Sequence, residues 1–296
     1  MRRAVDEAEE NVTGHSSPGN GSTRPTAGPA GRILPKAAVF LTVAFVAAGV
    51  LGALQPTTRI PAEVIQLTQF GPAFAVAVVA LRRPGWARSL PAVRAAKDSR
   101  GRVLLLATPP LIIALCAAAY GAITGDVGFT GPGSLPYPFV LIAAAQLLGA
   151  CAEELGWRCF LQPLLRTRYS PLLASVIVGL AWGVWHVQVL AQHPAYAGGF
   201  LLGTVSMSVV LGIALDRERG MGPARLLLAG GFHALINLGM LLFMDEESGA
   251  VLPMVLFGAA CLVAAVLWGT RRRLRSTGPT TAFVDPAGSH AISPSR

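Results

Sequence analysis

The sequence predicts an all-α polytopic membrane protein, with about eight transmembrane helices in one bundle and disordered tails. The 296-residue chain is 53% hydrophobic and only 13% charged. Its mean hydropathy of +0.55 is high for a soluble domain of this length. Its apolar runs also have the length that a bilayer requires of a helix, about 20 residues. Finally, basic residues alternate between the loops that join these runs.

Eight segments are apolar enough to be predicted as spans. They are residues 37–54, 64–81, 103–124, 138–158, 171–191, 198–215, 224–243 and 251–269. The fourth apolar stretch continues amphipathically to Leu165, so we expect that helix to bend along the interface. Three pairs of glycines have the GxxxG spacing that allows helix backbones to approach closely: Gly121 and Gly125, Gly179 and Gly183, and Gly199 and Gly203.

The two ends of the chain have a different composition from the spans. Residues 1–36 are polar and rich in Gly, Pro, Ser and Thr, which predicts a disordered cytoplasmic tail. Residues 271–296 predict a second disordered cytoplasmic tail. The transmembrane helical bundle is therefore predicted over 37–270.

The distribution of Lys and Arg predicts the topology. From the N-terminal tail through the seven successive loops to the C-terminal tail, the numbers of Lys and Arg residues are five, one, seven, none, three, none, three, none and five. These account for all 24 basic residues of the chain. Basic residues concentrate in cytoplasmic loops, so both termini are predicted to be cytoplasmic in a multi-pass protein integral to a bacterial cytoplasmic membrane. The arginines form short clusters rather than one patch, which argues against nucleic acid and leaves membrane lipid as the expected partner.

A few polar side chains interrupt the apolar spans. A charged group at mid-bilayer costs about 2.5–3.5 kcal/mol on insertion scales, so such groups indicate function. They are Glu153, Glu154 and Arg158 in the fourth span, His186 in the fifth, and His233 with Asn237 in the seventh.

Helical spacing predicts which of these side chains face each other. Glu154 and Arg158 are four residues apart and can form an ion pair. Glu153 is rotated by about 100° from Glu154 and is free to point at another helix. Counted from the cytoplasmic helix ends, His186 lies about 22 Å deep and His233 about 15 Å. We therefore expect the site in the cytoplasmic half of the bilayer.

A carboxylate, two imidazoles and an amide from three helices have a chemical use. A desolvated glutamate beside a histidine can take a proton from water, and the second histidine with the amide can stabilise an oxyanion. Adjacent carboxylates differ only in direction, so either Glu153 or Glu154 can be the base. Alternatively, Glu153, His186 and His233 match the ligand set of a catalytic zinc site. Trp182 is interpreted as a packing residue, and a purely structural ion pair is the alternative for Glu154 and Arg158.

The order of these residues resembles the CPBP family (CAAX protease and bacteriocin-processing, also called Abi or Rce1-like) of intramembrane proteases. Glu153-Glu154-Leu-Gly-Trp-Arg158 is similar to EExxxR, Trp182-Gly-Val-Trp-His186 to FxxxH with Trp in place of Phe, and His233-Ala-Leu-Ile-Asn237 to HxxxN. The resemblance implies a family core at about 138–243 and an eight-helix bundle with a conical cavity. It further implies that Glu153 and His186 activate water, that His233 and Asn237 hold the oxyanion, and that Glu154 and Arg158 support the site.

The resulting functional prediction is a glutamate-dependent, CAAX-protease-like metalloendopeptidase. It would hydrolyse a peptide bond of a membrane-associated or leader-type peptide, with peptide or protein as substrate and one divalent metal, most simply zinc, as cofactor. A non-proteolytic membrane binding protein, such as a bacteriocin immunity factor or a scaffold, is the alternative. A proton-coupled transporter also fits buried ionisable groups, but the paired interrupted spans typical of that class are not evident.

Overall fold

The computed structural model describes residues 33–82, 99–217, 222–243 and 250–276, and every regular element within these ranges is helical. Six helices are long and apolar enough to cross a membrane: α1 (Ile33–Thr58), α3 (Ser99–Thr124), the continuous stretch Phe139–Arg166 that begins with α4 (Phe139–Gly156), α7 (Pro194–Ala214), α8 (Pro223–Phe243) and α9 (Val251–Ser276). Two apolar helical stretches are shorter, Leu67–Arg82, which contains α2 (Gly71–Arg82), and α6 (Pro171–Trp185). The all-α multi-pass fold is thereby confirmed, and the eight predicted spans correspond to these eight helical stretches.

Several helix boundaries differ from the predicted ones. The predicted span 171–191 ends early, because α6 stops at Trp185 and residues 187–191 form a separate 3-10 turn. At about 1.5 Å per residue, α6 covers only about 22 Å, less than the hydrocarbon thickness of about 30 Å. His186 follows directly at the C-terminal end of this short helix. It therefore lies at a point where the chain turns rather than within a continuous span.

The two tails are shorter than predicted at their inner boundaries. Helix α1 begins at Ile33 rather than 37, since Pro35 sits in the first turn, where its missing N–H removes no helical hydrogen bond. Helix α9 continues through Arg271–Arg273 to Ser276, since arginine is a good helix former whose apolar stem can lie along the membrane edge. The remainder of the predicted disordered tails, 1–32 and 277–296, lies outside the described residues, as does 83–98 of the predicted cytoplasmic loop.

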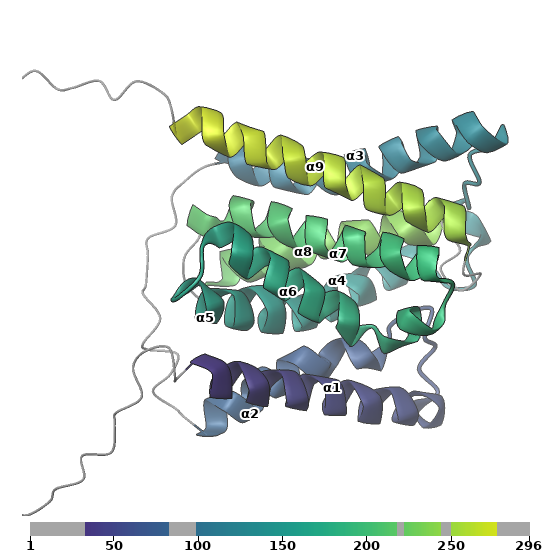
Figure 1. Cartoon of the computed structure of the whole chain (residues 1–296). Helices are drawn as coiled ribbons and strands as arrows, with labels where there is room; N and C mark the ends of the chain where they lie inside the picture. The colour runs from purple at the N-terminus through teal and green to yellow at the C-terminus, as the bar shows by residue number, and fades with distance from the viewer. Residues whose placement is uncertain (1–32, 83–98, 218–221, 244–249, 277–296) are drawn as a thin grey trace, which may run out of the picture.

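Each helix packs against two or more others in an order unlike their order in the chain. Helix α1 packs on α2, α2 on α4, α4 on α8, α8 on α3, α3 on α9, α9 on α7, and α7 on α6. Figure 1 shows α1 and α2 along one edge of the bundle, α3 and α9 along the opposite edge, and the other helices between them. The three helices that carry the motif residues, α4, α6 and α8, therefore occupy the middle of the bundle.

Glycines allow the closest of these contacts. A Cβ at Gly199 would lie 2.7 Å from the backbone oxygen of Met254, so α7 and α9 touch through backbone at this level. A Cβ at Gly179 would lie 2.6 Å from the Cα of Val205, which brings α6 equally close to α7. Two of the three GxxxG pairs thus lie at tight helix contacts, whereas Gly125 of the third has open space around it.

Charged residues gather at one end of the bundle. Asp216 accepts from Arg166 Nη2 and Arg272 Nη2, each at 3.1 Å, and so links α5 (Gln162–Arg166) with α9. The first turn of α1 and the last turn of α9 lie at the same end of the bundle (Figure 1), as an even number of crossings requires. We call this the basic end.

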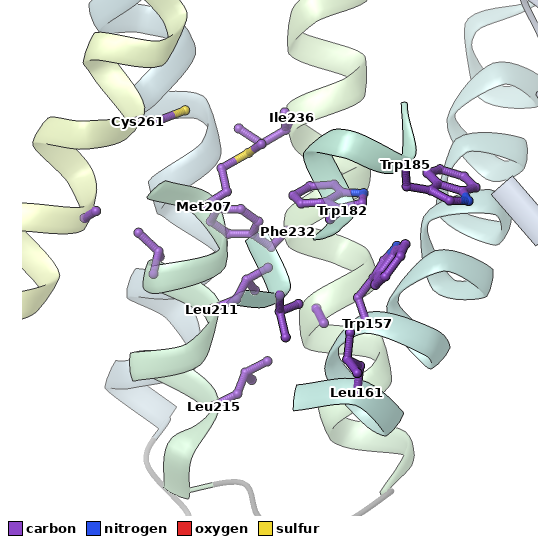
Figure 2. Close-up of a cluster of buried hydrophobic side chains, with 14 of the residues drawn as sticks. Trp157, Leu161, Trp182, Trp185, Met207, Leu211, Leu215, Phe232, Ile236 and Cys261 are labelled. Carbon is purple, nitrogen blue, oxygen red and sulfur yellow. The ribbon is translucent and has the colours of Figure 1, made fainter. Parts of the chain in front are cut away.

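Aromatic side chains fill the core between α4, α6 and α8. Figure 2 shows the indole of Trp182 in the middle of a buried cluster, with Trp157 and Trp185 on one side and Met207 and Ile236 on the other. Trp157 and Trp185 meet edge to face with their ring centroids 5.9 Å apart. This aromatic packing fixes the end of α6 against α4 and so fixes the residues next to it.

Candidate functional site

A cavity of about 800 Å³ lies among α1, α4, α6, α7 and α8, and its walls include residues of all three predicted motifs. Glu153 comes from α4, His186 from the end of α6, and His233 and Asn237 from α8. Glu153 is 2% exposed and His233 is 5% exposed, so both lie at the closed part of the cavity. The four residues predicted to be catalytic therefore line one cavity.

The two adjacent glutamates have different surroundings. Glu153 lines the cavity, and its Oε2 accepts a hydrogen bond of 2.8 Å from the indole nitrogen of Trp182. Glu154 is fully buried and is not part of the cavity wall. Trp182 therefore does more than pack, because it holds the Glu153 carboxylate through a bond that the phenylalanine of the family motif cannot make.

Glu154 belongs to a buried ionic group. Its Oε1 accepts from Arg158 Nη1 at 3.1 Å, as the i, i+4 spacing predicts, and from His233 Nδ1 at 3.0 Å. The guanidinium of Arg158 also lies over the ring of Trp182, 4.4 Å from the centroid. Three helices are thus joined by charge and aromatic contacts directly behind the cavity wall.

A π-helical turn, Trp157–Leu161, interrupts the helix directly after α4 and carries Arg158. Such turns are rare and are found mostly at functional sites. Arg225 of α8 stabilises this turn, since its Nε donates to the backbone oxygen of Arg158 at 2.9 Å and its Nη1 to that of Leu215 at 2.8 Å. This role was not predicted, because in the sequence Arg225 is one of several basic residues in a predicted cytoplasmic loop.

The hydrogen bonds made by Nδ1 of His186 and of His233 determine what the other ring nitrogen, Nε2, can do. His186 Nδ1 lies 2.9 Å from the backbone oxygen of Trp182, which can only accept, so Nδ1 carries the hydrogen. Nε2 of the neutral His186 ring therefore has a lone pair. His233 Nδ1 donates in the same way to the Glu154 carboxylate, which leaves Nε2 as the nitrogen that can interact with a substrate.

Asn237 has a partner that the motif does not contain. Its Nδ2 donates to Gln146 Oε1 at 3.0 Å, and both side chains line the cavity. Gln146 precedes Glu153 by seven residues, or two helical turns, and so lies on the same face of α4. A polar residue at that spacing in an apolar span was the sequence signal that could have identified it.

The predicted zinc ligands do not form a metal site in this conformation. Within the described part of the chain, no three His, Cys, Asp or Glu side chains lie close enough to hold a metal ion together. The acidic oxygen that contacts both Arg158 and His233 belongs to Glu154, which lies outside the predicted ligand set. We therefore derive no chemical step through a metal, and the zinc requirement stays a prediction.

These features define a multi-pass helical membrane protein with a cavity that combines a carboxylate, two imidazoles and an amide. Comparison with known proteins shows what one region of the chain is similar to. Residues 135–239 match the family described as type II CAAX prenyl endopeptidase Rce1-like, a range that includes all three motifs. The similarity to this family therefore lies in the part of the chain that carries the motifs.

Two relatives show how much of the chain this similarity covers. CAAX prenyl protease 2 of Methanococcus maripaludis is 30% identical over 176 residues, which are 55% of this chain and 62% of that protein. Lysostaphin resistance protein A of Staphylococcus aureus is 26% identical over 166 residues, which are 56% of this chain and 39% of that protein. The chain thus spans less than two thirds of the length of either relative.

Proposed function

We propose that this protein is an intramembrane endopeptidase that hydrolyses a peptide bond within the buried cavity. The observation that carries the proposal is the placement of Glu153, which lines the cavity, is almost completely buried, and is oriented by Trp182. The similarity of residues 135–239 to a family of prenyl endopeptidases supports the same reaction class.

In the proposed reaction, Glu153 is the general base. Its Oε2 is held by Trp182, so Oε1 can accept a proton from a water molecule. The water oxygen then forms a bond to the carbonyl carbon of the substrate, and His186 Nε2 accepts a second hydrogen bond from the same water. When the C–N bond breaks, Glu153 returns the proton to the leaving amine, so that protons balance over the cycle. Glu154 is unsuited to this role because both Arg158 and His233 contact its buried carboxylate.

His233 and Asn237 are proposed to stabilise the oxyanion. The Glu154 carboxylate stabilises a charged His233 ring, whose Nε2–H can then donate to the developing negative oxygen. The amide of Asn237 has two hydrogens, and Gln146 accepts only one of them at Nδ2. Both donors are held in place by hydrogen-bond partners, His233 by the buried Glu154 and Asn237 by the partly buried Gln146. This is the preorganisation that this kind of catalysis requires.

The proposal is tested by cleavage of a lipid-embedded peptide library by the purified full-length protein. We expect Glu153→Gln and His186→Ala to abolish cleavage, and the exposed His193→Ala, outside the cavity wall, to retain it as the matched control. Glu154→Gln separates the two glutamates, since it should keep measurable cleavage if Glu153 is the base. Full activity of Glu153→Gln would refute the proposal.

Zinc dependence is decided in the same assay by adding and removing a chelator. Loss of cleavage on chelation, with recovery on adding Zn²⁺, would establish a metal-bound water. Retained cleavage would assign activation of the water to Glu153 alone. If the wild-type protein cleaves no peptide of the library, the non-proteolytic binding function becomes the better description.

A further inference from the structure

The cavity opens at the end of the bundle opposite the basic end. Its exposed wall residues include Ala62, Glu63 and Gln66, between α1 and α2, and Gln188 and Gln192, between α6 and α7. The buried wall residues Glu153 and His233 mark its closed part. None of the basic-end residues Arg166, Asp216 or Arg272 contributes to the wall. The direction of this opening is separate from the depth of the site, and the predicted location in the cytoplasmic half of the bilayer stays a prediction.

The charge of the loops assigns the opening to one side of the membrane. The loop between α1 and α2, which forms part of the rim, contains a single basic residue, Arg59. The next connection along the chain, from Arg82 to Arg102, contains seven. Because positive residues are retained in the cytoplasm, the basic end is cytoplasmic and the rim lies on the opposite side.

The wall of the cavity is rich in amides. Six amide side chains contribute to it, Gln66, Gln69, Gln146, Gln188, Gln192 and Asn237. Gln69 is only 6% exposed, and its Oε1 has no hydrogen-bond partner within the described residues. This oxygen packs against Gly149 of α4. An amide both donates and accepts, which matches the alternating N–H and C=O groups of an extended peptide backbone.

The formal charges in the cavity wall disfavour a negatively charged ligand. Among the described residues, Glu63 at the rim and Glu153 at the closed part are the acidic residues of the wall, and neither lysine nor arginine contributes to it. A free carboxylate would therefore meet the negative charge of Glu63 at the rim. An uncharged backbone can enter, and a basic side chain would be attracted to Glu63 at the rim.

We infer that the cavity receives its substrate from the extracytoplasmic side, as an extended peptide segment that is uncharged or basic and that is held internally rather than by a C-terminal carboxylate. This inference rests on the proposed function for the cleavage step, but the side of entry does not. Within it, the amide side chains of the wall contact the peptide backbone, and Glu63 determines the preference for basic residues.

The side of entry is tested by labelling single cysteines with a membrane-impermeant, sulfonated maleimide. We expect Gln192→Cys at the rim to be labelled in intact spheroplasts, and Thr167→Cys at the basic end to be labelled only after lysis. Both positions are exposed. The unmodified protein gives the background, because three of its cysteines are buried and Cys151 is partly buried. Labelling of Thr167→Cys alone in intact spheroplasts would overturn the inference, whether or not the protein is a protease.

The substrate class is tested with peptides that differ only in one residue, Lys or Glu, or only in a free or amidated C-terminus. We expect the wild-type KM to be roughly two- to fivefold lower for the Lys peptide, as is typical of an exposed charge pair. Glu63→Gln should remove this preference, so that the Lys and Glu peptides have similar KM values. Asp126→Asn removes an exposed acidic charge outside the cavity wall and should leave the preference intact.

The outcomes separate the two proposals. A preference for the Glu peptide or the free carboxylate, or a Lys preference that survives Glu63→Gln, would overturn the substrate class while leaving endopeptidase activity established. Absence of cleavage for every peptide would refute the proposed function instead, and the labelling experiment would still decide the side of entry.

Discussion

Trp182→Phe tests how much the orientation of Glu153 contributes to catalysis. The substitution introduces the residue of the family motif and keeps an aromatic ring under the Arg158 guanidinium, but it removes the 2.8 Å hydrogen bond to Glu153. A hydrogen bond to a charged group contributes about 1.5–3 kcal/mol, and about 1.4 kcal/mol corresponds to a tenfold change in rate. We therefore expect kcat to fall roughly ten- to a hundredfold with a much smaller change in KM.

Trp157→Phe is the matched control for this experiment. Trp157 is fully buried in the same aromatic cluster, but its indole nitrogen has no hydrogen-bond partner within the described residues. The two substitutions remove the same atoms, and only one of them breaks a bond to the proposed base. We expect Trp157→Phe to retain nearly wild-type kcat, and both variants to show similar, small losses of thermal stability.

The assay is steady-state cleavage of a single peptide in proteoliposomes, with thermal unfolding of each variant followed in detergent. A Trp182→Phe protein with wild-type kcat would refute the argument that the indole positions Glu153. Equal losses of kcat in the two variants would show that the effect comes from core packing rather than from the hydrogen bond.

Three further predictions concern the surroundings of the site. Arg158→Met should lower the free energy of unfolding by about 3–5 kcal/mol, because it leaves the buried Glu154 carboxylate without its cation; Arg158→Met combined with Glu154→Leu should recover much of that loss in thermal unfolding. Gln146→Leu should lower kcat by about fivefold, since it removes the acceptor of a bond worth about 1 kcal/mol that orients Asn237; an unchanged kcat would show that Asn237 needs no such partner. Gly199→Val should lower the unfolding temperature, because a Cβ at that position would lie 2.7 Å from the Met254 oxygen; Gly198→Val, with open space around residue 198, should not.

Hydrophobic patterning predicted the helices well, because each membrane helix satisfies its own backbone hydrogen bonds and depends little on its neighbours. The predicted span 103–124, for example, corresponds to α3 at Ser99–Thr124. Hydrophobic patterning failed at 171–191. Helix α6 ends there at Trp185, inside the protein, and the residues before and after this helix end are together apolar enough to be predicted as one span. Hydropathy does not distinguish a residue that faces lipid from one that lines a turn inside the bundle.

The spacing rules also predicted contacts within one helix but not between helices. The pairing of Glu154 with Arg158 follows from four residues of separation, and it is present. The bonds of Trp182 to Glu153 and of Gln146 to Asn237 join helices that are distant in sequence, and they depend on how α4, α6 and α8 pack. A lone tryptophan or glutamine in an apolar span carries no local signal of its partner.

By itself, the sequence determined the helical membrane class, the number of apolar segments, which loops are rich in Lys and Arg, and which residues resemble the family motifs. Each of these depends on local composition or on residues within a few helical turns. The tertiary structure alone decided that Glu153 faces the cavity while Glu154 is enclosed by Arg158 and His233, and that the cavity opens away from the basic end. Those outcomes depend on the rotation of each helix about its axis, which is fixed by close packing at glycines and aromatic residues rather than by any one segment.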